Sequence, residues 1–110
     1  MARQPAGIMK GTLDLLVLKT LEIEPRHGVG VADRIRQISN GTFVVKPGSL
    51  FPALHRLEEE GFIAGEWSET PEGHRAKYYR ITPSGQKQLT SEKKNWARVV
   101  LAIGLILESE

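Results

Sequence analysis

The sequence predicts a mainly α-helical domain with a small β-hairpin and a long C-terminal helix, and three observations support this fold class. Between Lys46 and Glu60, apolar residues recur at the i, i+3, i+4, i+7 spacing of one helix face. After Gly61 the apolar period changes to two, which indicates strands. After Pro83 the helical period returns and continues to about Glu108.

Length and composition limit the possible classes of protein. The chain has 110 residues, 40% of them hydrophobic, which is enough for one folded domain with a modest core. Its formal net charge of +2 permits a polyanionic partner without requiring one. It has no cysteine, so disulfides and thiolate metal sites are excluded. The longest apolar run, Val99 to Leu107, is too short to span a bilayer, and without a secretory signal we expect a cytoplasmic protein.

The first predicted helix begins with Thr12 as its N-cap, after a loose tail over residues 1–10, and ends at Pro25. One face carries Leu13, Leu16, Val17 and Thr20, and the other carries Leu15, Leu18 and Leu21. A helix that is apolar on two sides is buried on two sides. We therefore expect one side to meet the domain core and the other to meet a second subunit.

A second amphipathic helix is predicted over Val31 to Ser39, and Asn40 and Gly41 stop it. Its inward positions are expected to be Ala32, Ile35 and Ile38. The β-branched and aromatic run from Thr42 to Val45 predicts a brief strand before the next helix.

The third helix is the stretch around which the chain is arranged. Pro47 suits its first position, and Gly61 suits the position just past its end. The face opposite its leucines carries Gly48, Ser49, Pro52, His55, Arg56 and Glu59. The N-terminal half of that face is small and polar, and the acidic residues of the helix lie at its C-terminal end. This arrangement is typical of a helix whose N-terminal half contacts nucleic acid. Taken alone, the stretch also fits an ordinary amphipathic surface helix.

Two strands and a last helix complete the chain. The strands are predicted over Phe62 to Ser68 and Lys77 to Ile81, joined by a charged tip. Thr82 and Pro83 then begin the last helix as N-cap and first residue. Its apolar stripe contains Leu89, Trp96, Val100, Ile103 and Leu107, widened by Val99 and Ile106. So small a domain cannot cover all of this surface, which again points to a partner subunit.

The order of helix, helix, helix, hairpin and long helix predicts a winged helix-turn-helix over residues 1–82 and a dimerisation helix over residues 83–110. Four runs, MKGTLDLLVLKTL, HGVGVADRI, PGSLFPALHRLEEEGFI and YYRITPSGQKQL, resemble the PadR-like transcriptional regulators in a short form with one helix after the wing. The resemblance implies a bacterial, cytoplasmic, homodimeric DNA-binding repressor, often with a small-molecule effector. Val29 and Phe51 depart from it, since relatives often have Tyr there, and Lys46 replaces a small polar residue.

The candidate DNA contacts lie on the third helix and the hairpin. They are Lys46, Ser49, Pro52, His55, Arg56, Arg75 and Lys77. Two of them have a plain structural alternative: Arg56 would pair with Glu59 or Glu60, and Ser49 would bond locally to the backbone. A dimer would bind a pseudo-palindromic operator in double-stranded DNA.

The candidate dimer interface comes from the first and last helices. Its residues are Leu15, Leu18, Trp96, Val99, Val100, Ile103 and Leu107. Two copies of Trp96 near a two-fold axis would sandwich a planar aromatic effector, which gains stacking energy. The alternative is that Trp96 packs as plain interface core.

The sequence carries no sign of catalysis, of a cofactor or of a metal site. Its three histidines match no ligand spacing, and no nucleophile elbow, phosphate loop or carboxylate pair is present. We therefore expect a protein that is not an enzyme. A winged-helix module for protein–protein contact, without DNA binding, is the alternative function, and an activator with the same DNA contacts is also compatible with the sequence.

Overall fold

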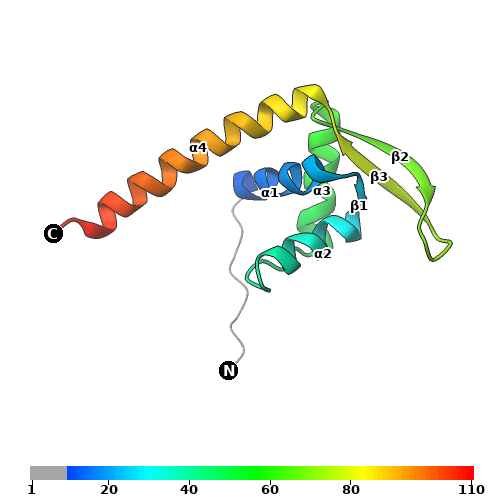
Figure 1. Ribbon diagram of the computed structural model, residues 1–110, viewed down its shortest axis with the longest axis horizontal. Helices are drawn as coiled ribbons and strands as arrows, with labels where there is room; N and C mark the ends of the chain where they lie inside the picture. The colour runs from blue at the N-terminus through cyan, green and yellow to red at the C-terminus, as the bar shows by residue number, and fades with distance from the viewer. Residues whose placement is uncertain (1–9) are drawn as a thin grey trace.

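A computed structural model describes residues 10–110 of the chain, and over them it shows the expected winged helix-turn-helix (Figure 1). Its elements in chain order are α1 (Lys10–Ile23), β1 (Arg26–His27), α2 (Gly28–Ile38), α3 (Pro47–Glu59), β2 (Ile63–Glu69), β3 (Arg75–Ile81) and α4 (Pro83–Glu108). The β2–β3 hairpin, called the wing below, extends away from the three packed helices, and α4 projects in the opposite direction (Figure 1).

The core is a cluster of mainly aliphatic side chains from α1, α2, α3, the first turns of α4 and the base of the sheet. Its largest fully buried members are Val17, Leu18, Leu21, Val31, Leu54, Leu57, Ile63 and Leu89. Leu18 is 0% exposed, so its prediction as a dimer contact is wrong: it fills the core of its own domain. Leu15 is only partly buried and still has surface to offer to a partner.

The sheet has three antiparallel strands in the order β1-β3-β2, with β3 in the centre. The pairing runs from Ile63 with Ile81 to Glu69 with Arg75, so the wing is longer and its tip shorter than the sequence predicted. Arg26 and His27 pair with Tyr79 and Tyr78 as a two-residue edge strand, where the sequence predicted only a connection.

Three local predictions differ from the structure. The second helix begins at Gly28 rather than Val31, because His27 is the N-cap and its Nδ1 accepts the N–H of Gly30 at 3.1 Å. Ile38 is 57% exposed and not inward, since it is the last residue of α2. The segment from Thr42 to Val45 is not a strand, because no other strand within residues 10–110 lies beside it to pair with.

The last helix begins as predicted and is fixed to the wing. Thr82 accepts the N–H of Gly85 at 3.0 Å, and its hydroxyl donates to the carbonyl of Gly61 at 2.6 Å. Position 85 requires glycine, because a Cβ there would lie 2.0 Å from the carbonyl oxygen of Phe62. The first helix differs, since it includes Lys10 and Thr12 is therefore inside its first turn rather than the N-cap. The predicted tail lies mostly outside the described residues.

Candidate nucleic-acid interface

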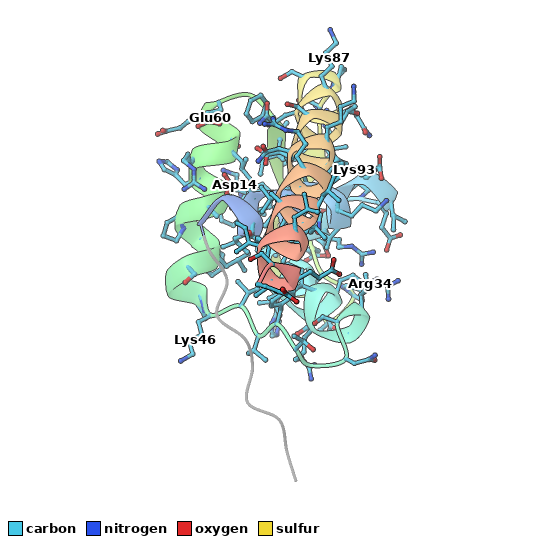
Figure 2. The ribbon with its side chains drawn as sticks, turned by 90° about the vertical axis from the view of Figure 1, so that its left-hand side faces the viewer. Asp14, Arg34, Lys46, Glu60, Lys87 and Lys93 are labelled. Atoms are coloured by element: carbon cyan, nitrogen blue, oxygen red, sulfur yellow. The ribbon has the colours of Figure 1, made fainter. Side chains whose placement is uncertain are left out.

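The outer face of α3, defined here as Gly48, Ser49, Pro52 and His55, is exposed, and all of it except His55 lies in the N-terminal half of the helix. The opposite face is buried in the core, which holds the helix in place. Its side chains, each no more than 2% exposed, are Leu50, Ala53, Leu54 and Leu57. Lys46 is the N-cap residue, and its side chain makes no cap hydrogen bond. Figure 2 shows Lys46 at one end of α3 and Glu60 at the other, so positive and negative charge are separated along the helix.

Arg56 is held by a residue that the sequence analysis did not consider. Its Nη2 is hydrogen-bonded to the carboxylate of Asp14 on α1, and the Arg56 side chain is 29% exposed. The expected alternative partners, Glu59 and Glu60, do not bind it among the described ion pairs. Burial raises the pKa of Asp14 above its ordinary value of 3.8, against the opposing effect of Arg56. The prediction of Arg56 as a DNA contact now competes with a pair that joins α3 to α1.

His55 lies on the outer face of α3 with its Nε2 2.9 Å from Oε1 of Glu59, one turn further along the helix. Both side chains are mainly exposed, so water screens the interaction, which does not fix the His55 side chain in place. His55 therefore remains available on this face.

Lys77 is bound by Glu58, so it is not a free cation on the wing. Its Nζ lies 2.7 Å from Oε1 of Glu58, and Oε2 of the same carboxylate accepts the N–H of Gly65 at 3.2 Å. Hydrogen bonding to Lys77 lowers the pKa of Glu58 below its ordinary 4.5 and, reciprocally, raises the pKa of Lys77. One carboxylate on α3 thus fixes both strands of the wing, and the prediction of Lys77 as a direct DNA contact is weakened.

The wing carries a second cation, Arg75, whose guanidinium lies 5.3 Å from the centre of the Trp67 ring. A cation over an indole face is attracted by the ring quadrupole, so this contact orients Arg75 without neutralising it. The tip that follows β2 is closed by bonds from Thr70 to His74 and from Gly73 to Thr70, with Gly73 at φ 85°. Arg75 is therefore a charged group presented by an ordered hairpin.

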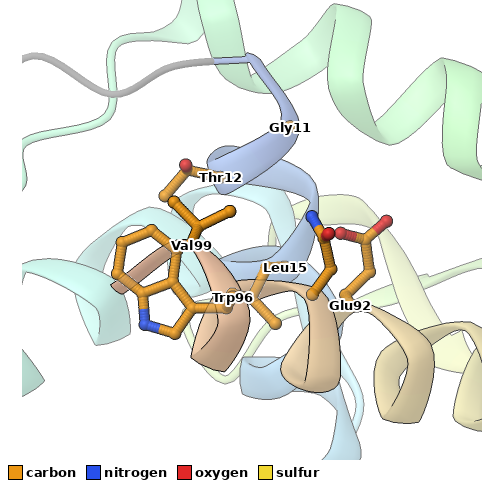
Figure 3. Close-up of a pocket in the computed structure, with 7 residues that line it drawn as sticks. Gly11, Thr12, Leu15, Glu92, Trp96 and Val99 are labelled. Atoms are coloured by element: carbon orange, nitrogen blue, oxygen red, sulfur yellow. The ribbon is translucent and has the colours of Figure 1, made fainter. Parts of the chain in front are cut away.

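The projecting part of α4 carries apolar side chains that nothing covers in residues 10–110. They are Trp96, Val100, Leu101, Ile103, Leu105, Ile106 and Leu107, each at least 45% exposed. Val99 is partly buried, since it faces α1 across a cavity of about 170 Å³. Figure 3 shows this cavity between Thr12 and Leu15 of α1 and Trp96 and Val99 of α4.

Sequence reasoning missed two groups of residues. Asp14 binds Arg56, and Glu58 binds Lys77. The two members of each pair are far apart in the chain, so no local spacing in the sequence predicts the pair. Val29, Phe51 and Trp67 are 60%, 48% and 58% exposed and lie around one cavity between α3 and the wing. The unusual apolar residues at positions 29 and 51 were the only available signal for this cavity. No group of three metal-ligating side chains and no membrane-spanning helix occurs within residues 10–110.

Comparison with known proteins gives the same fold and a family. The sequence profile of the transcriptional regulator PadR-like family matches residues 17–91. The chain is 32% identical to an uncharacterised protein of Lysinibacillus sphaericus over 94% of both chains, and 36% identical to the transcriptional regulator Rv3488 of Mycobacterium tuberculosis over 54% of both.

Solved structures agree with these sequence relatives. A transcriptional regulator from Clostridium thermocellum superposes with a TM-score of 0.83 at 28% identity, over 90% of this chain and 96% of the other. A PadR-like transcriptional regulator from Bacillus cereus superposes with a TM-score of 0.76 at 29% identity, over 92% and 96%. On the family profile and these neighbours, the chain belongs to the PadR-like family of transcriptional regulators.

Proposed function

We propose that this regulator binds a specific DNA operator as a homodimer and represses transcription from it. The observation that carries the proposal is the charge distribution along α3. No acidic residue occurs from position 40 to position 57, and Lys46 stands at the start of the helix with its charge unpaired by any described ion pair. The N-terminal end of α3 itself therefore presents no carboxylate to a duplex, while Glu58, Glu59 and Glu60 lie at the far end.

Each of the proposed DNA contacts has a role suited to its chemistry. Lys46 and Ser49 contact phosphates, the first by charge and the second as a hydroxyl donor. Pro52 and His55 approach base edges, because they are exposed on the same face of the helix, further along it than Ser49. Arg75 contacts the DNA backbone from the wing. In this proposal Arg56 and Lys77 position α3 and the wing and do not touch DNA directly.

The homodimer is proposed from the projecting half of α4. A two-fold contact would cover the same apolar patch in both subunits at once. Val100, Ile103 and Leu107 lie along one side of the helix and are exposed in the single chain, so they are the proposed centre of that contact. Leu15, which is partly exposed on α1 beside Trp96, would lie at its edge.

The effector is proposed to be a planar aromatic molecule that binds beside Trp96. The cavity in one chain, about 170 Å³, is smaller than a usual pocket of about 300–1,000 Å³, so the ligand would need the partner subunit on its other side. A ligand that favours one spacing of the two α3 helices would shift the dimer away from DNA. In a Trp67→Phe variant, such ligands should quench Trp96 and release DNA together. If ligands release DNA without any change in Trp96 fluorescence, Trp96 is only part of the core of the interface.

The test of DNA binding is a titration against salt. The protein is incubated with duplexes drawn from the region upstream of its own gene, and affinity is measured by fluorescence anisotropy between about 50 and 200 mM salt. Several phosphate contacts make the affinity fall steeply, and Lys46→Ala should lower the slope by about one. Affinity that is absent, or independent of salt, would favour the protein–protein module instead. A promoter fused to a reporter, with and without the protein, distinguishes a repressor from an activator.

A further inference from the structure

An apolar cleft of about 350 Å³ lies between α3 and the wing. Its walls include Val29 at the start of α2, Phe51 on the flank of α3 and Trp67 on β2. These three side chains keep between 48% and 60% of their surface exposed, so the folded chain does not use them as core. Clustered exposed apolar side chains usually mark a surface that another molecule covers.

The ring of Phe51 is held in a defined position. A Cβ on Gly28 would lie 2.9 Å from Cε1 of Phe51, so the ring sits directly over the backbone at the start of α2. Val29 follows Gly28 on the same turn and lines the same cleft. Two residues that depart from the family pattern in sequence therefore meet at one place in the fold.

Three of the polar residues around the cleft have little polar surface to offer to a partner, because they are bonded within the chain or buried. Nζ of Lys77 is bound to Glu58, Tyr79 is 7% exposed, and Nδ1 of His27 accepts from Gly30. Phe51 and Val29 bring no hydroxyl that could donate to a phosphate. What this part of the surface offers to a partner is mainly apolar contact.

Phe51, which lines the cleft, lies one helical turn from Gly48 and His55 of the outer face, the part that the proposed function places in the major groove. There the apolar group of a base pair is the C5-methyl of thymine, and contact with aromatic or aliphatic side chains selects it. Resting on the proposed function, we infer that Phe51 and Val29 contact one thymine methyl in each operator half-site. They act as specificity residues that read a base without a hydrogen bond.

The experiment removes that methyl and nothing else. A duplex is obtained by in vitro selection with the wild-type protein, and each thymine of one half-site is replaced in turn by deoxyuridine. At one position the replacement should weaken binding about fourfold in an anisotropy titration, the factor expected for one buried methyl group. The other replacements should change the affinity less than twofold.

Protein variants show whether the cleft senses the methyl. In Val29→Ala and Phe51→Ala, the deoxyuridine effect at that position should shrink to less than twofold. Ile38→Ala is the matched control, since Ile38 is an equally exposed apolar residue of α2 outside the cleft, and it should keep the full effect. Circular dichroism checks folding, and Val29→Ala carries the test if Phe51→Ala is unfolded.

Three results would overturn the inference while leaving DNA binding intact. They are a selected half-site without thymine, wild-type affinity that no deoxyuridine changes, and a methyl effect that Val29→Ala and a folded Phe51→Ala both retain. If the protein selects and binds no duplex at all, the proposed function fails first, and this inference fails with it.

Discussion

Glu58 on α3 and Lys77 on β3 are joined by an ion pair of 2.7 Å, and the same carboxylate accepts the N–H of Gly65 on β2. A Cβ on Gly65 would lie 2.3 Å from Cε of Lys77 and 3.0 Å from Oε2 of Glu58. The absence of a side chain at Gly65 therefore leaves room for the ion pair. One side chain of α3 therefore ties the helix to both strands of the wing. A duplex that contacts both elements would depend on that connection.

Removing Glu58 should weaken DNA binding although Glu58 is acidic and touches no phosphate. We expect Glu58→Ala to lower both the melting temperature and the affinity for a selected duplex, because the wing loses its fixed position. Lys77→Ala should have a similar effect, and the double variant should be little worse than either single one. Anisotropy titrations over the four proteins measure this coupling. If Glu58→Ala instead raises the affinity, repulsion from DNA dominates and the positioning role is wrong.

The same pair predicts a pH dependence of stability. The pKa of Glu58 is lower in the folded chain than its ordinary 4.5, so the folded state binds fewer protons there than the unfolded state. Its stabilisation is fully present above about pH 4.5 and is lost as the pH falls through the lowered pKa. The difference in free energy of unfolding between wild type and Glu58→Gln should therefore shrink on acidification. Urea denaturation at a series of pH values tests it, and a constant difference would contradict the ionic role.

Arg56 and Asp14 give a prediction that separates stability from recognition. Arg56→Ala leaves a partly buried carboxylate without its partner, which should cost about 1–3 kcal/mol of unfolding free energy. Asp14→Asn should cost less, since burial already raises the pKa of Asp14 and disfavours its charge. Neither variant should change which base is preferred at any operator position. A base preference that relaxes at one position in Arg56→Ala, but not in Asp14→Asn, would mean that Arg56 reads DNA directly.

The proposed dimer predicts a clear change on altering α4. Ile103 and Leu107 are 49% and 79% exposed in the single chain, so charged residues there cost the monomer little and disrupt an apolar contact. Ile103→Lys with Leu107→Lys should convert a dimer into a folded monomer with weaker operator binding. Light scattering gives the mass, and Lys94→Ala on the exposed first half of α4 is the control. A doubly substituted protein that stays dimeric would place the interface elsewhere.

How far the sequence predicts this molecule depends on how local each feature is. Helix α3 and the start of α4 were predicted well because Pro47, Gly61 and Thr82 are end signals that act within one turn. Strand β1 was missed because two residues carry no period, and only the pairing with β3 defines it. A strand at 42–45 was predicted from residue type alone, but a strand requires a neighbour.

The candidate site shows the same limit. Gly48, Ser49, Pro52 and His55 share an exposed face because the helical period places them there. The partner of Arg56 lies 42 residues earlier, on α1, and that of Lys77 lies 19 residues earlier, on α3. Charges that look free in a sequence can be paired by tertiary packing, so the list of direct DNA contacts becomes shorter once the fold is known.

The most direct measurement of the central claim is genome-wide mapping of the sites that the native protein occupies in its own cell. A dimer that presents two α3 helices should give sites in promoter regions that share an imperfect palindrome. The half-sites should lie about one helical turn, roughly 10 base pairs, apart. Lys46→Ala should reduce occupancy at all of them. Occupancy that follows no common sequence, or a motif without two-fold symmetry, would contradict the account.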